Sequence, residues 1–69
     1  MKKNYDFTEL SNKFNLSMDE AMAYFRIGER RLRAMMDDNP DAEWILHVGN
    51  RRYIKRPMFE SYLRTARQI

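Results

Sequence analysis

Residues 16–36 constrain the fold more than any other part of the chain. Ser17 precedes an apolar run that recurs at helical spacing, and Glu20 follows three residues later. This is the pattern of a capping box, in which the two side chains satisfy backbone N–H groups at the start of a helix. The pattern therefore predicts a short helix over residues 18–25 with one apolar face.

Gly28 interrupts this apolar stripe, and a second stripe begins beyond it that cannot continue the first. The second stripe predicts a helix over residues 29–38. Its end is set by Asn39-Pro40, because the residue before a proline is disfavoured in helical conformation. Two short helices joined by a tight turn containing glycine are typical of a helix-turn-helix, and Ile27 is expected to fill the space between them.

Two β-prone runs, residues 44–48 and 51–55, flank the pair Gly49-Asn50. Such a pair predicts a β-hairpin, with the glycine supplying the positive φ of a primed turn. The expected pairs are Val48 with Arg51, His47 with Arg52, and Ile45 with Ile54. One face then carries Ile45 and Ile54, and the other carries Trp44, Leu46 and Tyr53. One of these faces is expected to pack on the helices, and the sequence leaves open which.

The remaining segments complete the expected fold. Residues 13–16 alternate polar and apolar and predict a short strand. Pro57 suits the first turn of a C-terminal helix, whose apolar positions recur from Met58 to Ala66. Residues 1–12 form either a short helical turn or an extended arm, and residues 13–69 form the domain. The expected fold class is α+β: a winged helix-turn-helix of two short helices, a two-stranded β-hairpin wing, a C-terminal helix and a short N-terminal strand.

The size and composition of the chain exclude several classes of protein. Its 69 residues make one small domain, without cysteine and with His47 as the single histidine, so no disulfide, metal site or other cofactor is expected. No nucleophile, carboxylate pair or phosphate loop indicates an enzyme. No apolar run approaches a membrane span or a signal peptide, so we expect a cytoplasmic protein with no membrane partner.

Charge is distributed unevenly along the chain. Residues 26–36 carry a net charge of +3, residues 37–43 carry −4, and residues 44–56 carry +4. The acidic block lacks the glycine and the ligand spacing of a calcium loop, so it is interpreted as a solvated connector. Both basic blocks fall on elements that could contact one duplex, which favours double-stranded DNA as the partner over a merely solvated surface.

Several motifs together resemble a known family. They are Tyr24-Phe25-Arg26-Ile27-Gly28-Glu29, Trp44-Ile45, Gly49-Asn50-Arg51, Ile54-Lys55-Arg56 and Phe59. In this combination, which spans roughly residues 16–63, the sequence resembles the excisionases of conjugative transposons. That resemblance implies a winged helix related to the DNA-binding domain of MerR-type regulators. It also implies a non-catalytic recombination directionality factor that binds and bends DNA near the ends of a mobile element.

The resemblance further implies partners and contacts. A tyrosine-recombinase integrase is the expected protein partner, and further copies of the chain are expected on adjacent DNA sites. The second helix would enter the major groove and the wing the adjacent minor groove. By position, the contacts on that helix are Glu29, Arg30, Arg31 and Arg33, and those on the wing are Asn50, Arg51 and Arg52. Arg52 departs from the family, where an apolar residue is expected, which leaves the target sequence open.

Some of these residues have two interpretations. Glu29 either stabilises the positive end of its helix or accepts a hydrogen bond from cytosine N4. Arg26 either pairs with Glu29 across the turn or grips phosphate, and Lys55 and Arg56 are weaker phosphate contacts. Trp44 is favoured as core or surface cover over a platform for stacked bases.

Two other functions remain open. A small MerR-like transcriptional regulator would use the same fold, although such proteins usually append a dimerising helix and an effector domain. A protein-interaction module could instead dock on integrase without touching DNA. The adjacent arginines beside the hairpin turn argue against the module, because protein interfaces do not need them.

Overall fold

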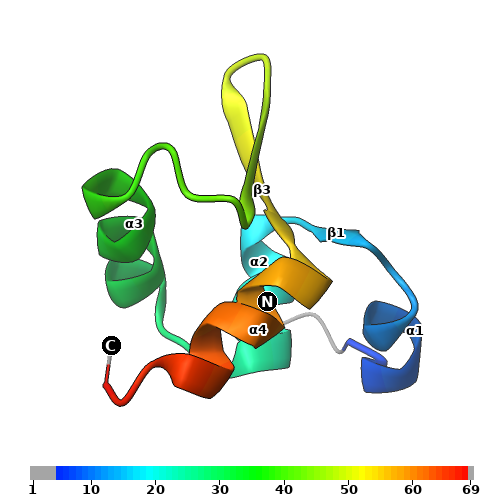
Figure 1. The fold of residues 1–69 in the computed structure, drawn as a ribbon. Helices are drawn as coiled ribbons and strands as arrows, with labels where there is room; N and C mark the ends of the chain where they lie inside the picture. The colour runs from blue at the N-terminus through cyan, green and yellow to red at the C-terminus, as the bar shows by residue number, and fades with distance from the viewer. Residues whose placement is uncertain (1–4, 69) are drawn as a thin grey trace.

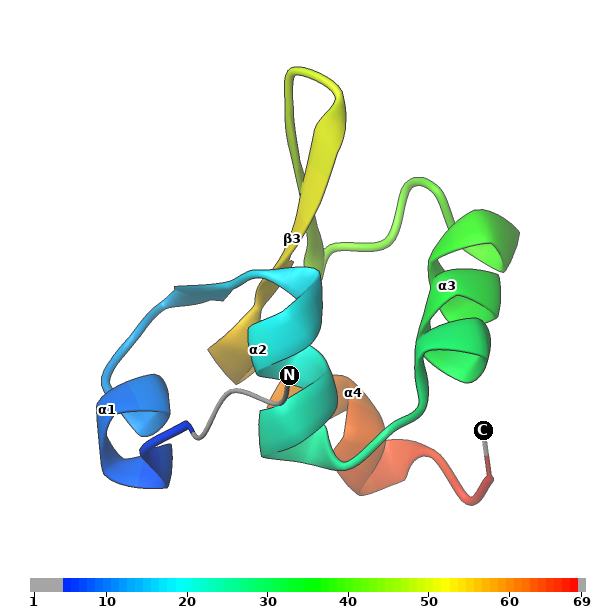
Figure 2. The same ribbon diagram turned by 180° about the vertical axis from the view of Figure 1, so that it is seen from behind.

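A computed structural model describes residues 5–68 of the chain (Figure 1). The elements run in the order α1 (Phe7–Ser11), β1 (Asn15–Leu16), α2 (Met18–Phe25), α3 (Glu29–Asp38), β2 (Ile45–Val48), β3 (Arg51–Lys55) and α4 (Arg56–Thr65). The fold is α+β and consistent with a winged helix, as predicted. Helices α1 and α3 lie on opposite sides of the body, and the β2–β3 hairpin projects from it as the wing (Figures 1 and 2).

The described part of the N-terminal segment is helical, which resolves the choice between a turn and an arm for those residues. The Asp6 side chain caps α1 by accepting the backbone N–H of Thr8 at 2.9 Å. Leu10 is only 2% exposed and anchors this short helix to the core. The expectation for residues 1–4 lies outside the described residues.

The helix-turn-helix has the predicted boundaries but an unexpected turn. Arg26 adopts the left-handed conformation with φ 58°, whereas Gly28 is extended and serves as the N-cap of α3. A Cβ at Gly28 would meet nothing within 4 Å, so sterics do not require glycine there. The chain therefore turns at the C-cap of α2, where arginine accepts a conformation that glycine usually supplies.

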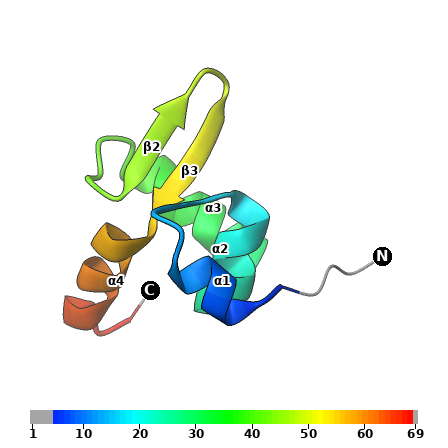
Figure 3. The same ribbon diagram turned by 90° about the vertical axis from the view of Figure 1, so that its right-hand side faces the viewer.

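Three antiparallel strands form one sheet in the order β1-β3-β2. The hairpin has the predicted register, including Ile45 opposite Ile54, and β1 adds Leu16 on the other side of Ile54. Gly49 has φ 59° and Asn50 does not have a positive φ, which is the pattern of a type II′ turn. Figure 3 shows the hairpin standing above the helices.

The core lies where the inner face of the sheet meets the helices. Ile45 and Ile54 are buried, so this is the face that packs inward. Phe59 of α4 is fully buried, and its ring centroid lies 4.6 Å from that of Trp44. Trp44 itself is 4% exposed, which supports the interpretation of this residue as core.

Candidate nucleic-acid interface

Helix α3 is sharply amphipathic. Its apolar side chains Leu32, Met35 and Met36 are buried, which turns the opposite face to solvent. The exposed face carries the predicted recognition residues Glu29, Arg30, Arg31 and Arg33. The helix therefore presents an arginine-rich surface because its hydrophobic residues fix its rotation on the core.

The two interpretations of Glu29 and Arg26 can be compared with the observed contacts. Glu29 pairs with Arg33 one turn along the helix, with 2.6 Å between Oε2 and Nη2. Arg26 is exposed at the turn and forms no ion pair with any residue between 5 and 68. The predicted alternative of an Arg26–Glu29 pair is therefore absent from the described residues, and the acid of the first turn pairs along its own helix instead.

A groove of about 330 Å³ lies where α3, the wing tip and the start of α2 meet. Helix α3 contributes Arg33, and the wing contributes Asn50, Arg51 and Arg52. Ser17 and Asp19 line it from the start of α2, a contribution that the sequence analysis missed. The fold thus brings predicted helix and wing residues, some seventeen positions apart in sequence, to one concave basic surface.

Arg52 has a role that sequence patterns could not reveal. Its Nη1 lies 2.8 Å from Oδ1 of Asp37, and the Arg52 side chain is 27% exposed. This ion pair joins β3 of the wing to the last turn of α3. The wing and α3 are therefore held together by an ion pair of Arg52, which also lines the groove.

The start of α2 is positioned by the predicted capping box. The backbone N–H of Ser17 donates to Oε1 of Glu20 at 2.9 Å, and the N–H of Glu20 donates to Ser17 Oγ at 3.2 Å. Lys13 Nζ donates to Oε2 of Glu20 at 2.6 Å. Burial disfavours the charged carboxylate, but the bonds from Lys13 and Ser17 outweigh it and hold the pKa of Glu20 below its usual value. The same hydrogen bond and charge raise the pKa of Lys13.

Two of the predicted phosphate contacts lie away from the wing tip. Lys55 ends β3, and its backbone N–H donates to the carbonyl of Trp44 at 2.8 Å. Arg56 pairs with Glu60 at 3.0 Å and donates from Nε to the carbonyl of Lys13 at 2.8 Å, which leaves its side chain 19% exposed. Arg56 therefore joins α4 to the strand β1 region and does not face the groove of Arg33.

The described residues show neither a metal site nor a membrane-spanning helix. Within residues 5–68, no group of three or more His, Cys, Asp or Glu side chains could hold a metal ion. None of the helices described there has both the length and the apolar composition that a bilayer span requires. His47 Nε2 lies 3.1 Å from the carbonyl of Pro40 and so links β2 to the loop that follows α3.

Comparison with known proteins gives a consistent result. The family described as "Excisionase from transposon Tn916" matches residues 3–69. A relative from Streptococcus agalactiae serotype V, named "Excisionase from transposon Tn916", is 43% identical over 53 residues. That alignment covers 77% of this chain and 79% of the relative.

Proposed function

The chain belongs to the family of the Tn916 excisionase, and we propose that it binds and bends DNA as a non-catalytic factor directing an integrase toward excision. The observation that carries the proposal is the basic groove shared by α3 and the wing. Two elements of one rigid surface can grip a duplex at two places, which an isolated basic helix cannot do.

Helix α3 is proposed to read the major groove. A helix fits this groove, and each base pair presents a distinct pattern of donors and acceptors there. The exposed arginines Arg30, Arg31 and Arg33 lie on the outward face of α3. Arginine is suited to reading guanine because its two donors match O6 and N7. Glu29 pairs with Arg33 and can orient that guanidinium toward a base.

The wing is proposed to enter the adjacent minor groove. Asn50 and Arg51 are exposed at the tip of a narrow hairpin that stands clear of the helices (Figure 3). Minor-groove contacts depend on charge and groove width more than on base identity. Arg26 would add a phosphate contact at the turn before α3, and Lys55 and Arg56 would contribute weakly.

Bending follows from holding the duplex at both elements. Elastic estimates put the cost of bending a typical site at about 1–6 kcal/mol, which contacts in two grooves can offset. Copies on adjacent sites would add their bends and bring integrase-bound sites together. The chain would thus act by geometry, with strand cleavage left to the tyrosine-recombinase integrase.

Three measurements test this proposal. An excision assay with the integrase should show a higher yield when the protein is added, and no cleavage by the protein alone. Circular-permutation gel shifts should show bent complexes. About five neutralised phosphates should give log K against log salt a slope of about −4 to −5, at about 0.9 per phosphate.

Two results would favour the rival functions. Straight complexes with an unchanged excision yield would support the transcriptional regulator. Integrase binding without any duplex binding at about 50 mM salt would support the interaction module, because nonspecific electrostatic binding is strongest at low salt.

A further inference from the structure

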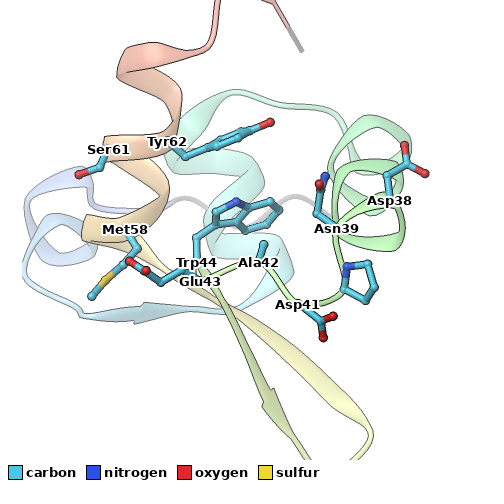
Figure 4. Close-up of a pocket in the computed structure, with 10 residues that line it drawn as sticks. Asp38, Asn39, Asp41, Ala42, Glu43, Trp44, Met58, Ser61 and Tyr62 are labelled. Carbon is cyan, nitrogen blue, oxygen red and sulfur yellow. The ribbon is translucent and has the colours of Figure 1, made fainter.

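A second groove lies at the C-terminal end of α3. It has a volume of about 660 Å³ and is formed by the C-terminal end of α3, the loop over residues 39–44 and α4 (Figure 4). None of the residues proposed to contact DNA lines this groove. Its chemistry differs from that of the basic groove, so it is suited to a different ligand.

The floor of this groove is aromatic. The ring centroids of Trp44 and Tyr62 lie 5.7 Å apart, and Tyr62 is 37% exposed. Met58 of α4 also lines the groove. Tyr62 thus leaves an apolar ring open to solvent directly beside the buried core, where an apolar side chain from a partner could pack.

Trp44 offers a polar contact from the same floor. Although the residue is 4% exposed, its indole N–H donates to no acceptor within residues 5–68. Within those residues, every fully buried side-chain nitrogen or oxygen has a hydrogen-bond partner. The indole nitrogen has none, so it must retain some exposure to solvent. Figure 4 shows the indole nitrogen on the side of the ring that faces Tyr62. A partner carbonyl could therefore complete a hydrogen bond that the chain leaves unmade.

Three carboxylates surround this floor. Asp38, Asp41 and Glu43 are exposed and lie on different sides of Trp44 (Figure 4). None of the three forms an ion pair with any residue from 5 to 68. Their charge repels the phosphate backbone, so this groove is unsuited to DNA and complementary to a cationic partner.

We propose that this groove docks a lysine- or arginine-bearing segment of the integrase. The segment would place its cations against Asp38, Asp41 and Glu43, an apolar side chain on Tyr62 and a main-chain carbonyl on the indole N–H of Trp44. The choice of integrase rests on the proposed function. A second copy of this chain is a poorer match, because its exposed arginines on α3 and the wing are then engaged with DNA.

The single tryptophan makes the groove directly observable. The full-length protein, isotopically labelled, is titrated with unlabelled integrase, and the one indole N–H resonance is followed by NMR. The groove variants are Asp41→Lys and Glu43→Lys. The matched control is Glu9→Lys, which changes net charge equally at an exposed position on α1, across the body from α3.

We expect the indole resonance of the wild type and of Glu9→Lys to shift on addition of integrase, more than the backbone resonances of α1. Each groove variant should bind integrase about five- to tenfold more weakly, because like charges would then face each other. Its affinity for duplex alone should match that of Glu9→Lys, since both variants gain the same charge.

Unchanged integrase affinity in both groove variants overturns the inference. So does a loss of cooperative binding between copies on DNA with integrase binding intact, which would assign the groove to a second copy. Either result leaves the proposed function standing if the wild type still bends DNA and raises excision. Failure of the wild type in those assays would instead reject the proposed function.

Discussion

The two grooves of this protein are built on one helix and have opposite charge. The basic groove is lined by Arg33 of α3, by the wing and by the start of α2. The acidic groove is lined by Asp38 at the end of α3, by the following loop and by α4. A single ten-residue helix therefore contributes to two surfaces of opposite charge.

The order of charges along α3 is unfavourable for the helix itself. Arg30 and Arg31 lie near its positive N-terminal end, and Asp37 and Asp38 lie in the last turn, at its negative end. Glu29 is the one acid in the first turn, and no basic residue stands in the last. A helix dipole favours the reverse arrangement by about 0.3–1 kcal/mol per charge. The charges of α3 therefore do not contribute to helix stability through the dipole.

The largest expected effect tests whether both grooves depend on one core. Leu32 is a fully buried residue of α3, the helix that lines both grooves. Leu32→Ala should lower the free energy of unfolding by about 2–5 kcal/mol through lost burial and a residual cavity. Urea denaturation measures this loss, and both DNA and integrase binding should fall together. Loss of one binding activity alone would mean that the grooves are structurally independent.

The next largest effect distinguishes the contribution of α3 to DNA binding from that of the wing. At least one of Arg30→Ala, Arg31→Ala and Arg33→Ala should cost about 1–3 kcal/mol of DNA binding selectively at one base position. Arg51→Ala should instead weaken all duplexes by a similar factor and make the salt slope shallower. Selection of sites from a random duplex library distinguishes the two. If every α3 variant selects the wild-type sequence, this division between helix and wing is wrong.

Local rules predicted the framework of the basic groove well. The capping box of Ser17 and Glu20 gave the start of α2, and the Gly49-Asn50 pair gave the hairpin register, because each depends on residues a few positions apart. The positive φ expected of Gly49 is present, whereas the positive φ of Arg26 in the helix-turn-helix was not predicted. Backbone conformation at that turn is set by how α2 and α3 pack, which the local sequence does not encode.

Contacts between segments distant in the chain could not be predicted from the sequence. The Asp37–Arg52 pair joins residues 15 positions apart, and the basic groove includes Asp19 from a third element. Residues 37–43 were interpreted as a solvated connector. Their carboxylates are indeed exposed, but three of the four acids there surround Trp44, which only the tertiary fold brings beside Tyr62. Whether the predicted site residues contact DNA remains a prediction.

A smaller effect compares the two aspartates that end α3. Asp38 has no ion pair within residues 5–68, so Asp38→Asn should relieve repulsion at the helix end and stabilise the fold by about 0.3–1 kcal/mol. Asp37→Asn is the matched control, because it also loses the ion pair with Arg52 and should gain less. Thermal unfolding of both variants measures the difference. Equal stabilisation would indicate that the Asp37–Arg52 pair contributes nothing to stability.

The smallest effect concerns the start of α2, which lines the basic groove but not the acidic one. Glu20→Gln retains a side chain that can complete the capping box and removes the charge that Lys13 contacts. The loss in the free energy of unfolding at neutral pH should be at most about 1 kcal/mol, as for other partly exposed pairs.

The pH dependence of this loss follows from the lowered pKa of Glu20. A carboxyl whose pKa is lower in the folded state contributes stability above its unfolded pKa of about 4.3, and that contribution disappears as pH falls through the folded pKa. The raised pKa of Lys13 keeps its cation charged throughout this range. The wild type should therefore be more stable than Glu20→Gln at pH 7, and the two should converge as the pH falls through the folded pKa of Glu20. Urea denaturation at several pH values gives the comparison, with Lys13→Gln as the control that removes the other charge. A difference that persists unchanged at acid pH would show that the amide disturbs the cap itself and that the charge contributes little.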